Sequence, residues 1–298
     1  MPRISLLCST VFIYFLLALS LAGQEGVAAR GPIPAGWFKY PAEKLERLDQ
    51  DALRCFNYSQ NEWKVSSDGA VVRITRLVRR SPRVRDESDE LPLPRLAKHE
   101  PGMPGRTVRF GLRAVLHFRN GWLLAYDAGE FGGGLWLTNE DGSKTRRILS
   151  DNVTEMVRVG DEVLVLSGLD HGTMDFGNAF LFSEPEGLNI SLQHFARLNG
   201  APRGYVKEQS GSVLFVTTAG LCRITKSGEV AWLTDLPRWS QHGFTNSMAI
   251  TSDGSIFIGM RMFVLRLIPN AGGYKQGWLL PENCQTFSVR EYECVCHQ

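Results

Sequence analysis

Two neighbouring stretches of the sequence carry ionisable side chains in a similar arrangement. Residues 126–134 read YDAGEFGGG and residues 169–178 read LDHGTMDFGN, and both contain Asp-X-Gly followed by Phe-Gly. Carboxylates gathered in loops suit Ca²⁺, and a mixture of acids and an imidazole suits a polar ligand. The ionisable side chains of the two stretches are Asp127, Glu130, Asp170, His171 and Asp175.

The glycine cluster at residues 129–134 raises the question of phosphate binding. A phosphate loop needs a strand, a glycine turn and then a helix whose N-terminus faces the phosphate. Here the glycines lead into GLWLTN, which is a strand pattern, and no Lys-Ser/Thr pair closes the loop. We therefore exclude a nucleotide site and predict that these glycines turn one strand into the next.

Other motifs that would name a reaction are missing from the sequence. It contains no Gly-X-Ser-X-Gly nucleophile elbow, no His-Glu-X-X-His zinc helix and no cysteine–histidine spacing typical of a zinc site. The sequence therefore predicts no specific catalytic residue.

A repeat positions the ionisable loops. Units of four short apolar runs begin near residues 114, 153, 201 and 246. Steps of about 40 to 50 residues are the length of one four-stranded unit. The second run of each unit is the most apolar (WLLAY, VLVLS, VLFVT and IFIG), as expected of a strand buried on both faces.

These units predict an all-β, β-propeller-like fold with about five four-stranded blades. They resemble the loose blades of NHL-type bacterial propellers over roughly residues 60–283. A fifth blade begins with NEWKVSSDGAVVRITRL and is completed either by residues 107–111 or by residues 286–295, and the second choice would join the two ends of the chain. The alternative fold is an irregular β-sandwich.

In a propeller, the loops between second and third strands emerge on the same face as the connections between blades. We therefore expect the two ionisable loops to meet those connections at one mouth of a central channel. The predicted binding set is Glu130, His171, Asp175, Arg203, His242 and Asn246. Some calcium-dependent propeller lactonases and hydrolases resemble this arrangement, which implies a Ca²⁺ set of Asp127, Glu130, Asp170 and Asp175. The competing interpretation is that Asp127 and Asp170 cap their own turns through Asx hydrogen bonds.

The ends of the chain indicate its domain organisation. Arg3 is followed by an apolar run and then by small residues, the layout of a signal peptide over residues 1–23. A single membrane anchor is the alternative, and we expect no membrane span after cleavage. The remaining segments are a helical lead-in over 24–54 with a helix at 41–54, a propeller-like domain over 55–283 with a Pro/Arg-rich insertion at 78–106, and a Cys-containing tail over 284–298.

Five cysteines follow the predicted signal peptide. An exported protein meets an oxidising compartment, where disulfides are expected. Cys222 lies in an apolar run and is predicted to be a buried small hydrophobe. The predicted disulfide set is Cys55, Cys284, Cys294 and Cys296, and zinc binding by the terminal cluster is the alternative.

The sequence therefore predicts a secreted or periplasmic binding module for an extracytoplasmic protein or carbohydrate. The formal net charge of +2 gives no support for a nucleic-acid partner. The alternative function is a Ca²⁺-dependent hydrolase or lactonase with its site at the channel mouth.

Export makes a first testable prediction. Because Arg3 precedes an apolar run that ends in small residues, we expect signal cleavage, and N-terminal sequencing of the mature protein should begin between residues 21 and 31. A product that retains Met1 and fractionates with membranes would contradict it.

Overall fold

The computed structural model describes residues 33–41, 61–77, 111–118, 121–183, 190–225, 227–236, 245–284, 286–290 and 293–297. Within these residues the regular secondary structure consists of strands and one 3₁₀ turn, η2 (Gly129–Phe131). No helix in this part of the chain has the length and hydrophobicity that a membrane span requires. The described part of the chain is thus all-β, as predicted.

Four antiparallel four-stranded meanders follow one another along the chain and are called blades 1 to 4. Blade 1 contains β4 (Leu112–Phe118), β5 (Gly121–Asp127), β6 (Gly133–Asn139) and β7 (Thr145–Leu149). Blade 2 contains β8 (Val153–Val159), β9 (Glu162–His171), β10 (Met174–Ser183) and β11 (Ser191–Leu198). Blade 3 contains β12 (Pro202–Lys207), β13 (Val213–Thr217), β14 (Gly220–Ile224) and β15 (Val230–Asp235). Blade 4 contains β16 (Ser247–Ile250), β17 (Ile256–Gly259), β18 (Val264–Asn270) and β19 (Gly273–Pro281).

Blade 4 has a fifth strand that the sequence did not indicate. β1 (Trp37–Tyr40) pairs antiparallel with β19, with Tyr40 opposite Trp278. The lead-in that was predicted to be helical therefore contains a strand. This short run shows no alternation of its own, and its pairing partner lies at the far end of the repeats.

The position of a fifth blade is held by a hairpin of β2 (Trp63–Ser67) and β3 (Val72–Arg76). β20 (Thr286–Arg290) and β21 (Glu293–His297) pair with each other as a separate two-stranded sheet. Closure of the fifth blade by residues 286–295 was therefore a wrong prediction.

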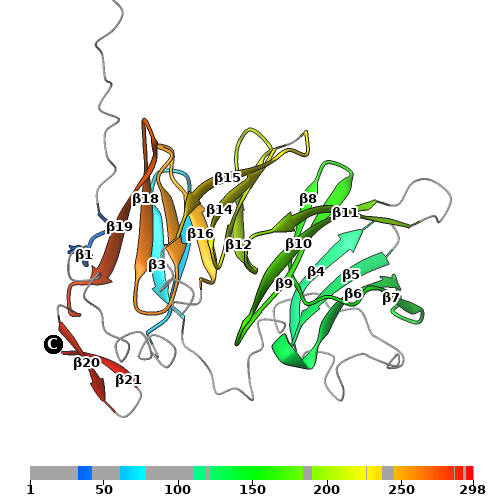
Figure 1. Ribbon diagram of the computed structural model, residues 1–298, viewed down its shortest axis with the longest axis horizontal. Coiled ribbons are helices and arrows are strands. Elements are labelled where there is room, and N and C mark those ends of the chain that lie inside the picture. Colours follow the sequence, from blue (N-terminus) through cyan, green and yellow to red (C-terminus); the bar gives the residue numbers. More distant parts are fainter. Residues whose placement is uncertain are drawn as a thin grey trace, which may run out of the picture.

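The first strands of the blades lie next to one another. β4 contacts β8, β8 contacts β12, β12 contacts β16, and β16 contacts β2. Figure 1 shows the blades in an arc, from the orange strands of blade 4 beside cyan β3 to green blade 1. Four complete blades and a hairpin in succession make the fold propeller-like, as predicted.

The second strand of each blade is buried on both faces, so its alternate residues belong to different interfaces. In β9, Val163 and Val165 pack in the core shared with blade 1, whereas Leu164 packs in the core shared with blade 3. In β13, Phe215 faces blade 2 and Leu214 faces blade 4. One fully apolar strand thus joins two neighbours, and each fully buried side chain of this kind contributes about 1.5–3 kcal/mol.

The glycines of residues 129–134 form the turn that the sequence predicted. η2 connects β5 to β6, and Gly129 and Gly132 adopt positive φ angles of 62° and 99°. The Ala128 amide donates to the Gly132 carbonyl at 2.8 Å. A strand follows this turn, so the segment lacks the helix that a phosphate loop requires.

Cys222 and Cys284 are both buried. Cys222 is free, and burial raises the pKa of its thiol to about 12, so it is a small hydrophobe rather than a nucleophile or ligand. Cys284 is disulfide-bonded. Cys294 and Cys296 lie in β21, and the pairing of Cys55, Cys284, Cys294 and Cys296 stays a prediction.

Several expectations fall outside the described residues. These are the signal peptide over 1–23, most of the helix at 41–54, the insertion at 78–106, the position of Cys55 and that of His242. Each of them stays a prediction from sequence.

The packing makes a second testable prediction. Phe215 is fully buried between blades 2 and 3, so Phe215→Ala should lower the free energy of unfolding by about 3–5 kcal/mol. Urea denaturation measures this loss. The matched control is Val230→Ala, which truncates an exposed residue of the same blade and should cost at most about 0.5 kcal/mol. Equal losses for the two variants would contradict the interblade core.

Candidate functional site

The β9–β10 hairpin divides the ionisable residues of its loop between two faces. Asp170 pairs with Asp175 across the hairpin, and His171 pairs with Met174. Because side chains alternate along a strand and cross-strand partners share a face, the two aspartates lie on one face and His171 lies on the other.

The two aspartates bind blade 3. Asp170 accepts a hydrogen bond from Arg203 at 3.1 Å. One oxygen of Asp175 accepts from the Ala201 amide at 2.9 Å and from the Thr218 hydroxyl at 2.6 Å. This face of the hairpin therefore anchors blade 2 to blade 3.

The opposite face binds the glycine loop of blade 1. His171 Nε2 lies 2.9 Å from a carboxylate oxygen of Glu130, and about half of each side chain is exposed. A second link joins the same two blades, because the side-chain amide of Asn152 donates a hydrogen bond to the Gly129 carbonyl at 2.8 Å. The two long loops thus lie side by side at one end of the blades.

The sequence contains three N-glycosylation sequons. Asn152 belongs to an Asn-X-Thr sequon, and Asn57 and Asn189 each belong to an Asn-X-Ser sequon. The Asn152 side chain is buried and its amide nitrogen is used by the Gly129 contact, so this sequon does not present a nitrogen for a glycan. Asn57 and Asn189 lie outside the described residues.

A polar cavity of about 300 Å³ opens beside these loops, between the first strands of the blades and the β2–β3 hairpin. Its charged and polar lining side chains are Glu62, Arg113, Asp127, Thr154, Glu155, Arg203, Thr245, Asn246 and Arg261. Arg203 and Asn246 of the predicted binding set therefore line this cavity together with Asp127 of the predicted Ca²⁺ set.

Three equivalent irregularities in the strands direct side chains to this cavity. The first strands of blades 1, 2 and 3 each contain an extra residue that has no partner on the second strand. These extra residues are Arg113, Thr154 and Arg203, and all three line the cavity. β-bulges of this kind re-aim a side chain and are frequent next to active sites.

The charges of the cavity are balanced by their neighbours. Arg113 lies 3.2 Å from Asp127. Glu62 is buried. One of its carboxylate oxygens lies 3.8 Å from Nε of Arg261, and the other accepts a hydrogen bond from the side-chain amide of Asn246 at 3.1 Å. The lining contains three arginines and three acids, so the site is polar without a net charge.

The carboxylates of the predicted Ca²⁺ set each have a different partner. Asp127 caps its own turn by accepting from the Gly129 amide at 2.9 Å, as the Asx interpretation predicted, and it also pairs with Arg113. Asp170, Asp175 and Glu130 bind blade 3 or His171 instead. No three His, Cys, Asp or Glu side chains of the described residues gather as in a metal site. This arrangement does not fit Ca²⁺, which requires several oxygen ligands around one point.

The sequence did not single out Arg113, Thr154, Glu62 or Arg261. A weak signal exists for the first two, since each is the second residue of a blade's first strand, as is Arg203. Glu62 and Arg261 are brought together by an isolated bridge between distant parts of the chain. No local pattern indicates such a contact.

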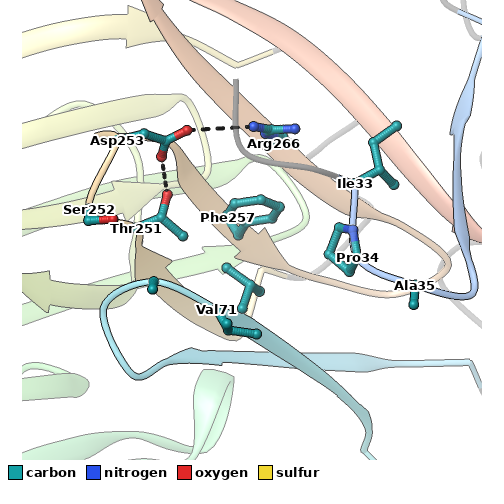
Figure 2. Close-up of a pocket in the computed structure, with 11 residues that line it drawn as sticks. Ile33, Pro34, Ala35, Val71, Thr251, Ser252, Asp253, Phe257 and Arg266 are labelled. Atoms are coloured by element: carbon teal, nitrogen blue, oxygen red, sulfur yellow. Dashed lines mark hydrogen bonds and ion pairs between the residues drawn. The ribbon is translucent and has the colours of Figure 1, made fainter. Parts of the chain in front are cut away.

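A second cavity of about 340 Å³ lies at the fifth-blade hairpin and has mostly apolar walls. Figure 2 shows Ile33, Pro34, Val71 and Phe257 around it. Its carboxylate, Asp253, accepts from the Ser255 amide and hydroxyl and thus belongs to its own turn. This cavity holds none of the predicted site residues.

Comparison with known protein families finds no match, and comparison with curated proteins finds no relative. Solved structures that resemble the chain are β-propeller proteins. They include a streptogramin B lyase (11% identity, 56% of this chain and 54% of that chain, TM-score 0.37). A gluconolactonase from Xanthomonas campestris has 16% identity over 60% of each chain, with a TM-score of 0.37. The calcium-binding protein regucalcin from Agrobacterium tumefaciens has 12% identity over 57% of this chain and 61% of that chain, also with a TM-score of 0.37.

The chain therefore spans less than two thirds of the length of these proteins. TM-scores of this size carry no argument about activity, ligand or metal. The propeller-like description rests on the strand topology of the chain itself.

Sequence analysis placed Glu130 and Asp175 together in the predicted binding set, but in the structure Asp175 is held by blade 3. Asp175→Ala removes the acceptor of the Ala201 amide and the Thr218 hydroxyl, so it should lower the free energy of unfolding by about 1–3 kcal/mol. Glu130→Ala is the control, because an exposed ion pair contributes at most about 1 kcal/mol. Chemical denaturation distinguishes them, and an unchanged stability of Asp175→Ala would contradict the anchoring role.

Proposed function

We propose that this protein is an exported binding module that takes a small, uncharged, hydroxyl-rich ligand, a carbohydrate, in the polar cavity. The observation that carries the proposal is the set of three equivalent bulges that direct Arg113, Thr154 and Arg203 to one place. Two of these side chains are arginines and the third is a threonine, so the bulges bring hydrogen-bonding groups from three blades to one cavity.

The balance of charges supports a neutral ligand. Sugar hydroxyls donate and accept hydrogen bonds, and the cavity offers both guanidinium donors and carboxylate acceptors. Because Arg113 and Arg203 are held by Asp127 and Asp170, their donors are positioned before a ligand arrives. Such preorganisation lowers the entropic cost of binding.

The size of the cavity favours a small molecule over a protein surface. A volume of about 300 Å³ lies at the lower end of the range for small-molecule sites. A stable protein interface needs a much larger, less concave area, of about 1,000 Å² or more. The location is the predicted secreted or periplasmic compartment, where carbohydrates are met.

The alternative function is a Ca²⁺-dependent hydrolase or lactonase. The four carboxylates of its proposed metal set are committed to different partners. No described group of residues favours it over the binding module.

The test uses the full chain and an array of neutral mono- and disaccharides, followed by calorimetry. Arg203→Ala should reduce affinity by about tenfold to a hundredfold, because it removes charged hydrogen bonds to the ligand. The matched control is Arg223→Ala, which breaks a similar ion pair with Glu208 at 2.9 Å but does not line the cavity.

Binding should persist after treatment with EDTA. Binding to no neutral sugar, or equal affinity of the Arg203→Ala variant and the unaltered protein, would contradict the proposal. Sugar binding or hydrolysis that requires Ca²⁺ would favour the alternative.

A further inference from the structure

Exposed apolar side chains gather on the two loops beside the cavity. The exposed fractions are 77% for Phe131, 47% for Met174 and 37% for Phe176. Phe131 follows Glu130 in η2, and the two other residues begin β10. A contiguous exposed apolar patch beside a polar site often marks a binding surface.

The pairing of the β9–β10 hairpin places these groups on one face. Met174 is the cross-strand partner of His171, and Phe176 lies two residues further along the same strand. All three side chains therefore share the face that is opposite the anchoring aspartates. Since His171 binds Glu130, the neighbouring Phe131 belongs to the same surface. We call Glu130, Phe131, His171, Met174 and Phe176 the lip.

The lip is joined to the polar cavity through the loop of blade 1. Asp127, which lines the cavity, accepts from the Gly129 amide at the start of η2. On the blade 2 side, Asp170 binds the cavity residue Arg203 from the hairpin face opposite His171, so the link to the cavity runs through η2. A ligand that fills the cavity and extends past these residues reaches the lip.

We propose that the lip is a second subsite, which holds the next sugar units of an oligosaccharide whose first unit occupies the cavity. This inference rests on the proposed function and specifies its ligand as a chain rather than a single sugar. A pyranose ring presents a patch of C–H groups surrounded by hydroxyls. The C–H patch lies on the Phe131 ring, and the hydroxyls bond Glu130 and His171 at its edge.

The composition of the lip distinguishes an oligosaccharide from other partners. An anionic membrane or nucleic acid would be met by lysines and arginines, and the lip has none. The Glu130–His171 pair offers hydrogen-bond donors and acceptors, and the aromatic and methionine side chains around it offer stacking. A peptide that places apolar side chains on the lip is the competing ligand.

Calorimetry of the full chain tests the inference with two β-1,4-linked series. These are glucose, cellobiose and cellotetraose, and N-acetylglucosamine, chitobiose and chitotetraose. In at least one series the tetrasaccharide should bind about tenfold more tightly than the monosaccharide, as stacking on one aromatic ring allows. Phe131→Ala should remove this gain and leave monosaccharide affinity unchanged, whereas Phe131→Tyr should retain it.

Two controls separate this role from a structural one. Phe131 is mostly exposed, so Phe131→Ala should leave the melting temperature unchanged. Val230→Ala truncates an exposed apolar residue that lies in β15, outside the lip, and should leave the gain intact.

The outcomes distinguish this inference from the proposed function. Monosaccharide binding that depends on Arg203 but shows no gain with chain length, or a gain that survives Phe131→Ala, overturns the lip subsite alone. Binding of no sugar overturns both. Phe131-dependent selection of peptides from a displayed library, without sugar binding, would assign the lip to a peptide instead.

Discussion

The fold depends on the second strand of each blade, which is apolar on both faces. In β9 and β13 alternate side chains pack into the cores of two different interfaces, so one strand holds three blades together. A strand that is buried in this way has no face left for chemistry. The polar cavity is therefore lined by the first strands, by the end of β5 and by residues of the connections between blades.

The first strands reach the cavity by breaking their own regularity. One unpaired residue in β4, β8 and β12 directs Arg113, Thr154 and Arg203 inward while the rest of each strand stays in its sheet. The acids that neutralise the two arginines lie at the ends of the second strands, Asp127 in β5 and Asp170 in β9. The two long loops thus support the cavity through Asp127 and Asp170 and present exposed apolar groups beside it.

The sequence predicted the repeated units because the apolar runs and the polar turns between them are local features. It also predicted Arg203 and Asn246 at the cavity, from their place in the connections between blades. Arg113 and Thr154 were missed because a bulge changes the register without changing the apolar pattern. Asp175 was predicted to belong to the binding set, and its contact with Ala201 was missed because that contact depends on the position of the next blade. The strand β1 was missed because its partner β19 is remote in sequence.

Hydrogen exchange with and without the tetrasaccharides tests most directly whether the polar cavity and its loops are the ligand site. The account predicts slower exchange on addition of cellotetraose or chitotetraose in residues 126–134, 169–178 and 201–207, which contain the two loops and the bulge of blade 3. The second, apolar cavity provides the contrast, since it is lined by residues of a different part of the fold. Slower exchange in residues 68–72 and 251–257, with no change at the loops, would contradict the account.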